Sequence, residues 1–184
     1  MTESCWLPRR AITDAALPAS SCRLLLALCV RYDPAQVVSI GLPSLRELTG
    51  LSIPTIRSAL KALLDSGYLL PVGSLHCEHR RCCFTKEPML KLNRGIFTRL
   101  MVSQLTNMDM RVFLLLYVSQ SAEQAEISIR MIAYFLNAGT SSICRSLKAL
   151  STAGLLQIEQ EQDRRGVYLP NRYIFPTANA DFVI

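Results

Sequence analysis

The chain contains one segment twice, and this repeat limits the possible folds more than any other feature of the sequence. Residues 55–69 read TIRSALKALLDSGYL, and residues 142–156 read SICRSLKALSTAGLL. Aligning Leu-Lys-Ala-Leu in the two copies pairs Leu60 with Leu147 and also superposes two isoleucines and two glycines. Because an internal repeat indicates a repeated structural unit, we expect two small domains of one type.

The distance between the copies suggests the domain boundaries. We expect a first domain with an N-terminal segment over residues 1–92, a connector over 93–104 and a second domain over 105–184. Half of the residues are apolar, which argues against disorder and supplies a core for each domain. The longest apolar runs hold seven residues, whereas a membrane-spanning helix needs about 20. Because the N-terminus has neither the basic start nor the apolar stretch of a signal peptide, we expect a cytoplasmic protein with no membrane partner.

In each copy, apolar periodicity and helix-capping residues predict the order helix, strand, helix, turn, helix and hairpin. In the first copy the helices are expected over 20–32, 44–49 and 52–66, the strand over 37–40, and the hairpin arms over 68–75 and 82–86. In the second copy the helices are expected over 108–120, 130–136 and 140–153, the strand over 126–129, and the arms over 155–160 and 167–174. Residues 89–100 are expected to form a last strand and an amphipathic connector.

This order of elements resembles the winged helix-turn-helix family. Residues 44–69, SLRELTGLSIPTIRSALKALLDSGYL, carry the resemblance, and residues 168–175, YLPNRYIF, resemble the returning wing strand of phage and plasmid replication proteins. The likeness covers about residues 18–92 and 105–175, and it includes replication initiators, origin-binding phage domains and bacterial transcription regulators. It implies a mainly α fold with small β wings (α+β), two winged helix-turn-helix domains in tandem, and double-stranded DNA as the partner.

The third helix of the first copy is the predicted reading helix. Its apolar stripe, which we expect to be buried, comprises Ile53, Ile56, Leu60, Leu63 and Leu64. The predicted DNA-binding residues are Ser52, Thr55, Arg57, Ser58 and Lys61. Short hydroxyl side chains near a helix N-terminus can approach phosphates or base edges, and arginine can read guanine with two hydrogen bonds. We expect Thr55 and Ser58 near bases, Lys61 on phosphate and Arg57 on either. The alternative is that Arg57 and Lys61 are only a solvated helix face.

The second copy offers a similar but less basic set of candidates. Its predicted DNA-binding residues are Thr140, Ser141, Ser142, Arg145 and Lys148. However, Cys144 takes the place of Arg57, and Met131 takes the place of Ser44. Residues 1–99 carry 13 Lys and Arg against 7 Asp and Glu, whereas residues 100–184 carry 7 of each, so the whole net charge of +6 belongs to the first part. The second copy is therefore expected to be a weaker DNA reader, or a dimerisation or partner-binding module.

Each predicted wing carries two adjacent arginines, Arg80-Arg81 and Arg164-Arg165. On the tips of hairpins these side chains would reach phosphate or the minor groove, although arginines on a turn are often only exposed to solvent. Glu159, Glu161 and Asp163 precede the second pair and should weaken its attraction to phosphate.

The chain has seven cysteines, an odd number that does not suggest a disulfide framework. We expect Cys22, Cys29 and Cys144 to lie in the core. The segment around the first wing, LHCEHRRCC, contains possible metal ligands: His76, Cys77, His79 and Cys82. Their spacing differs from the usual zinc pairs, which favours a wing with alternate residues buried over a structural metal or a thiol-based sensor. No cofactor is expected.

The sequence therefore predicts sequence-specific binding of double-stranded DNA. The expected role is that of a replication-initiation (origin-binding) protein or a transcription regulator of plasmid or phage type, associated with a bacterial nucleoid or plasmid. The alternative is a protein-interaction module, either a homodimer or a complex with a replication or transcription partner. An enzyme is not expected, because the sequence has neither a GxxxxGK[ST] motif nor a glycine-rich nucleotide loop after a strand.

Overall fold

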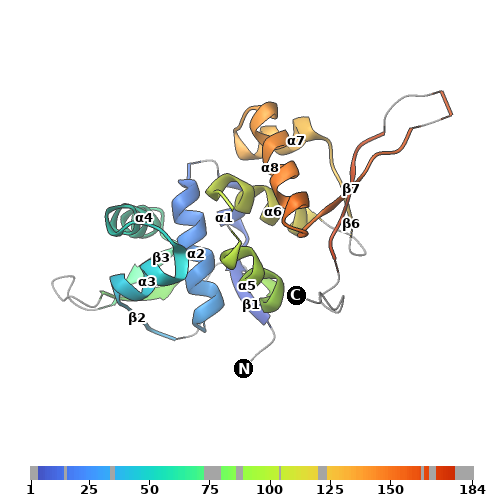
Figure 1. Ribbon diagram of the computed structural model, residues 1–184. Helices are drawn as coiled ribbons and strands as arrows, with labels where there is room; N and C mark the ends of the chain where they lie inside the picture. Colours follow the sequence, from blue (N-terminus) through green and yellow to red (C-terminus); the bar gives the residue numbers. More distant parts are fainter. Residues whose placement is uncertain are drawn as a thin grey trace. The chain divides into compact units, whose positions relative to one another are not determined.

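The computed structural model describes residues 4–14, 16–33, 36–72, 80–85, 89–103, 105–119, 124–162, 164–165 and 169–176. The chain divides into two compact units, Met1–Val102 and Ser103–Ile184. Both are mainly helical with small antiparallel sheets (Figure 1), which confirms the predicted α+β fold with small β wings. Within the part of the chain described, none of the helices combines the length and the apolar character needed to cross a bilayer.

The first unit contains an N-terminal arm that the sequence did not predict. This arm consists of β1 (Ser4–Pro8) and α1 (Arg10–Thr13). The elements that follow are α2 (Ala19–Arg31), β2 (Val38–Ile40), α3 (Leu42–Thr49), α4 (Ile53–Asp65), β3 (Leu69–Pro71), β4 (Arg80–Phe84), β5 (Met89–Asn93) and α5 (Arg94–Val102). In the three-stranded sheet β4 lies between β2 and β3, and in the two-stranded sheet β1 pairs antiparallel with β5.

The second unit has a very similar order of elements. They are α6 (Asn107–Ser119), β6 (Gln124–Glu126), α7 (Ile129–Leu136), α8 (Thr140–Thr152), β7 (Gln157–Glu159) and β8 (Arg172–Ile174). The returning strand β8 lies between β6 and β7, as β4 does between β2 and β3. The strand predicted over 126–129 was misplaced, because β6 shares only Glu126 with that range. The Ser128 hydroxyl accepts a hydrogen bond from the Met131 backbone N–H (3.2 Å), so a helix begins at Ile129 instead.

The repeat is also visible in the backbone. Gly50 ends α3 in the left-handed conformation (φ 67°), and Asn137, at the matching position, ends α7 in the same conformation (φ 48°). Glycine and asparagine are the residues that adopt this conformation most readily. The turn between the second and third helices is therefore made in the same way in both units.

The core of each unit lies around its first long helix. In α2 the residues from Leu24 to Cys29 are all buried, and the helix contacts α3, α4, α5 and β1. The buried face of α4 consists of Ile56, Ala59, Leu60 and Leu63, whereas Ile53 and Leu64 are only half-buried. In the second unit α6 contacts α7 and α8. An aromatic cluster of Phe113, Tyr117 and Phe175, with ring centres 5.5 to 5.9 Å apart, joins α6 to the residue that follows β8.

The N-terminal arm is fastened to the end of α4 by a partly buried polar network. The Arg10 guanidinium donates hydrogen bonds to the Ser66 carbonyl (2.9 Å) and the Tyr68 hydroxyl (3.2 Å), and lies 4.7 Å from the Tyr68 ring centre. The Tyr68 hydroxyl in turn donates to Asp14 (2.7 Å). A cation bound to a carbonyl at a helix C-terminus is electrostatically favourable. The arm thus helps to fix the position at which α4 ends.

The left-handed turn after α3 gives a test of the backbone argument. Gly50→Ala should lower the free energy of unfolding by about 1 kcal/mol, because a Cβ in this conformation clashes with its own backbone. No other group lies within 4 Å of the added Cβ, so packing should add nothing to this cost. Gly50→Asn, which copies Asn137, should cost clearly less. Urea unfolding of the two variants measures the difference, and equal costs would contradict the backbone explanation.

The network around Tyr68 predicts a loss of stability in alkaline solution. Burial, together with the hydrogen bond to Asp14, raises the pKa of Tyr68 from 10.0 to about 12. Because the folded state favours the protonated phenol, its contribution to stability is complete below pH 10 and is lost as the pH rises toward about 12. Urea unfolding across this range should show a weaker pH dependence in Tyr68→Phe than in the wild type. The exposed-residue control Tyr134→Phe should behave like the wild type.

Candidate nucleic-acid interface

The third helices of the two units share five exposed positions, and α8 exposes Thr140, Ser142 and Ser151 in addition. In α4 the shared positions are Pro54, Arg57, Ser58, Lys61 and Asp65, and in α8 they are Ser141, Cys144, Arg145, Lys148 and Thr152. Each helix therefore presents two cations to solvent, although only the lysine occupies the same position in both. Arg145 is the counterpart of Ser58, so the missing arginine at Cys144 is replaced one residue later. In α4 the only acidic residue is Asp65, at the C-terminal end of the helix, and α8 has no acidic residue.

Two of the three predicted hydroxyl residues of the first unit, Ser52 and Thr55, are occupied in capping α4. The Ser52 hydroxyl accepts a hydrogen bond from the Thr55 backbone N–H (3.3 Å) and shares another with the Thr55 hydroxyl (2.8 Å). Thr55 is half-buried, whereas Ser58 is exposed. Base contacts by Ser52 or Thr55 would compete with the cap, while Ser58 is free of this constraint. In α8 the cap is Gly139, which offers no side chain.

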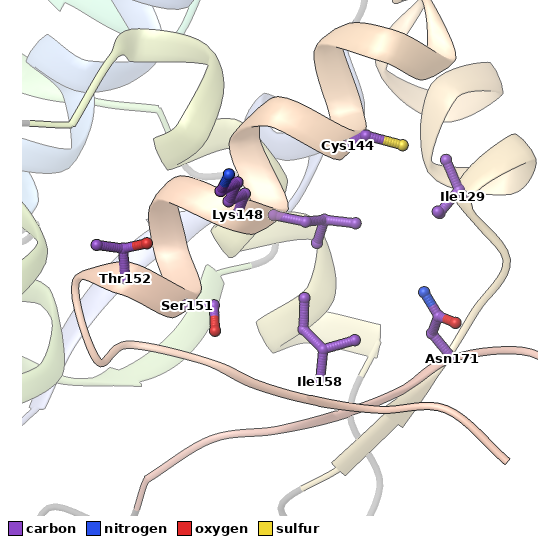
Figure 2. A pocket seen from close by; sticks show the side chains of 8 residues that line it. Ile129, Cys144, Lys148, Ser151, Thr152, Ile158 and Asn171 are labelled. Atoms are coloured by element: carbon purple, nitrogen blue, oxygen red, sulfur yellow. The ribbon is translucent and has the colours of Figure 1, made fainter.

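The exposed ridge of α8 stands between two hollows. Figure 2 shows the first, of about 350 Å³, which extends from Cys144 and Lys148 on α8 toward Ile158 of β7 and Asn171. The second, of about 450 Å³, is lined by Arg145 and Lys148 together with Ser103, Leu105, Ala149, Thr152 and Ala153. Lys148 lines both hollows, so its side chain is at the crest of the ridge. A helix with a hollow on each side can enter a groove of a binding partner, because the hollows leave room for the two walls of that groove.

The second unit separates its charges between two surfaces. Residues 129–152 contain Arg130, Arg145 and Lys148 and no acidic residue. On the sheet, Arg172 lies opposite both Glu126 and Glu159, and it forms ion pairs with them (3.3 and 4.0 Å) and with Glu161 (3.0 Å). The neutral net charge therefore conceals a cationic pair of helices and a sheet with more carboxylates than cations. The net charge of residues 100–184 does not reveal this separation, because it sums the charges of both surfaces.

The arginine pairs lie in different local structures. Arg80 and Arg81 belong to β4, opposite Ile40 and Ser39, so their predicted place on a turn was wrong. The strand begins two residues earlier than expected because β2 offers backbone partners to these positions. The Arg81 side chain is exposed on the sheet. Arg164 and Arg165 do lie on a turn, between β7 and β8, and both are exposed.

The described cysteines range from buried to exposed. Cys22 and Cys29 are buried, as predicted, but Cys144 is exposed and its predicted place in the core was wrong. The buried stripe of α8 is formed by Ile143, Ser146, Leu147 and Leu150, which turns position 144 outward. Cys82 is buried and Cys83 is half-buried. The other candidate metal ligands, His76, Cys77 and His79, lie outside the described residues, and the described residues contain no group of three or more metal-binding side chains.

Fold and surface together define a mainly helical protein with small β wings that exposes a cationic helix face in each unit. Neither a protein-family model nor a curated protein sequence matches the chain. Among solved structures, a possible transcriptional regulator from Methanosarcina mazei Go1 is similar at 22% identity, over 52% of this chain and 73% of that chain, with a TM-score of 0.35. The function must therefore be argued from the chain's own surfaces.

The burial of the thiols predicts which cysteine reacts first. Burial raises the pKa of Cys5 and of Cys82 to about 11, and it raises the pKa of Cys29 well above its usual value, so these thiols stay protonated and covered. Among the described cysteines, Cys144 should be alkylated fastest by a maleimide in the native protein. Peptide mapping after brief labelling measures this order, and Cys144→Ser is the control. Faster labelling of Cys29 would show that the first unit opens readily.

Proposed function

We propose that the protein binds double-stranded DNA in a sequence-specific manner through two winged helix-turn-helix units in tandem. The observation that carries the proposal is that α4 and α8 expose the same five positions, with two cations each and no acid in their first three turns. A solvated helix face has no physical reason to exclude carboxylates in both copies. A surface that approaches phosphates does, because like charges would repel.

The supporting chemistry divides the exposed side chains by role. Lys61 and Lys148 are suited to phosphate, which sets the register of the helix on the duplex. Arg57 and Ser58 are exposed on α4 beside Lys61, and Arg145 is exposed on α8 beside Lys148. These side chains are suited to contacts with base edges. The hydroxyls of Ser141 and Ser142 lie in the first turn of α8, where phosphate contacts are favourable. Thr140, Arg81, Arg164 and Arg165 complete the proposed set as further phosphate contacts.

The first unit is the proposed principal reader, because it carries the whole excess of positive charge. Two roles are compatible with this activity: an origin-binding replication-initiation protein or a transcription regulator of plasmid or phage type. In both roles the chain would mark a DNA site and recruit other proteins. Selection of bound sequences from a random duplex pool tests the proposal. A palindrome would indicate a homodimer, a direct repeat would indicate two units reading in tandem, and no preference would contradict specific binding.

The two lysines provide a matched test of phosphate contact. Lys61→Ala and Lys148→Ala should each weaken binding to all sequences and lower the slope of log affinity against log salt by about 1. Lys91→Ala, which removes an exposed lysine from β5, should leave the slope unchanged. Ser58→Ala should instead change the selected sequence with little effect on general affinity. Fluorescence anisotropy with duplex DNA over a salt series measures the slopes. A slope near zero for the wild-type protein would exclude the DNA-binding proposal.

A further inference from the structure

Three large apolar side chains are exposed together on α7 in the second unit. Met131 is 47%, Tyr134 78% and Phe135 36% exposed, and the two rings are in edge contact with centres 5.8 Å apart. Arg130 is exposed on the same face, because residues three and four apart are neighbours on a helix. Single exposed apolar residues are common, but a group of them on one helix indicates a contact surface. We call these four side chains the α7 face.

The fold does not require the α7 face. The matching positions of α3 in the first unit are Pro43, Ser44, Glu47 and Leu48. Both helices nevertheless end in a left-handed turn and contact the first and third helices of their unit. The same structural element thus forms with exposed rings in one unit and without them in the other. The reason for the exposed rings therefore lies outside the fold of the unit itself.

The α7 face is complementary to itself. It contains two pairs of unlike side chains, each with members four residues apart: Arg130 with Tyr134, and Met131 with Phe135. When two copies of a helix pack antiparallel about a two-fold axis at the middle of this face, each member of a pair lies beside the other member on the second copy. A guanidinium on an aromatic ring and a thioether beside an aromatic ring are both favourable contacts. An antiparallel second copy therefore supplies a suitable partner for all four side chains.

The charge of α7 also favours an antiparallel partner. The backbone dipole makes the start of a helix positive and its end negative, so acidic residues suit the first turn and basic residues the last. In α7 the first turn has no acidic residue and the last turn no basic one, and the only charged residue, Arg130, lies at the positive end. In an antiparallel pair each Arg130 lies toward the negative end of the other helix, where a cation is favourable. A parallel pair would bring the two guanidinium groups together, and like charges repel.

The size of the α7 face indicates a weak pair. Taking roughly 200 Å² for a large side chain, the exposed parts of Met131, Tyr134 and Phe135 amount to about 300 Å² in each copy. Standard complexes bury about 800 Å² per partner. We therefore expect association at protein concentrations between about 10 µM and 1 mM.

We propose that two copies of the protein pair through α7, with the two helices antiparallel about a two-fold axis. The apolar side chains cover one another, and each Arg130 lies on the Tyr134 ring of the other copy. Because the two contacting surfaces are the same, the pair is closed and a third copy finds no free α7 face. The exposed positions of α8 are not part of this contact. The pairing requires no DNA, and its symmetry matches that of a palindromic DNA site.

Sedimentation velocity without DNA, at protein concentrations from about 10 µM to 1 mM, tests the pairing. The average mass of the wild-type protein should rise from 20.5 kDa toward that of two chains and stop there. Tyr134→Lys places an ammonium group opposite Arg130 of the other copy, and Arg130→Glu removes the cation that lies on the ring. Each variant should raise the dissociation constant of the pair at least about tenfold. Both side chains are exposed, so neither substitution disturbs the core.

Combining the two substitutions tests which positions meet. In an equimolar mixture of the single variants, a mixed pair brings the new carboxylate of one chain beside the new ammonium group of the other and keeps one Arg130–Tyr134 contact. The mixture should therefore form pairs at concentrations at which each variant alone is a single chain. The double variant Arg130→Glu, Tyr134→Lys should also pair, because an antiparallel arrangement places opposite charges together at both positions. In a parallel arrangement the double variant would place equal charges together and remain a single chain.

The first unit supplies the matched control. Glu47 is exposed and holds in α3 the position that Tyr134 holds in α7, so Glu47→Lys should pair like the wild type. Circular dichroism should show that every variant is folded. A wild-type mass that stays at one chain, which would leave the α7 face to a different protein, or that passes two chains would overturn the proposal. So would a double variant that fails to pair. These measurements contain no DNA, so the pairing and the proposed DNA binding fail separately.

Discussion

Burial of one apolar stripe on the third helix determines which side chains each unit can present to a partner. In α4 the stripe is Ile56, Leu60 and Leu63, and the helix packs against α2. A helix has 3.6 residues per turn, so fixing this stripe inward fixes Lys61 outward. Rotating the helix by one residue would bury an unpaired ammonium group at a cost of at least several kcal/mol. The fold and the candidate interface are therefore consequences of the same constraint, and α8 repeats it against α6.

The elements that follow from local rules could be predicted, and those that depend on distant partners could not. Ser52 identifies the start of α4 because capping involves residues only three positions apart. The arm formed by β1 has no such signal, because its strand pairs with β5 at the other end of the unit. The bond between Arg10 and Tyr68 likewise joins residues 58 positions apart. Periodicity within a short window contains no information about either contact.

The candidate site shows the same division. The outward direction of Arg145 and Lys148 follows from helical spacing alone. Cys144 was misplaced because cysteine is usually buried, and this preference outweighed a helical phase that turns the position outward. The row formed by Glu126, Arg172 and Glu159 requires the register of three strands, one of which returns after a long hairpin. No count of charges along the sequence reveals that these three side chains meet on one sheet.

The net charge of the second unit is zero, but its positive and negative side chains lie on different surfaces, so the net charge does not describe either surface. Electrostatic interactions in water are screened over about 8 Å at physiological ionic strength, so a ligand at α8 responds to the groups near that helix. There it meets Arg145 and Lys148, while the carboxylates around Arg172 belong to the sheet. A neutral unit can therefore bind an anion on one surface and a cation on another. The first unit, with its excess of positive charge, can also attract DNA nonspecifically from a distance. For the DNA binding proposed above, the excess of positive charge on the first unit would make it the principal reader, although each third helix presents two cations.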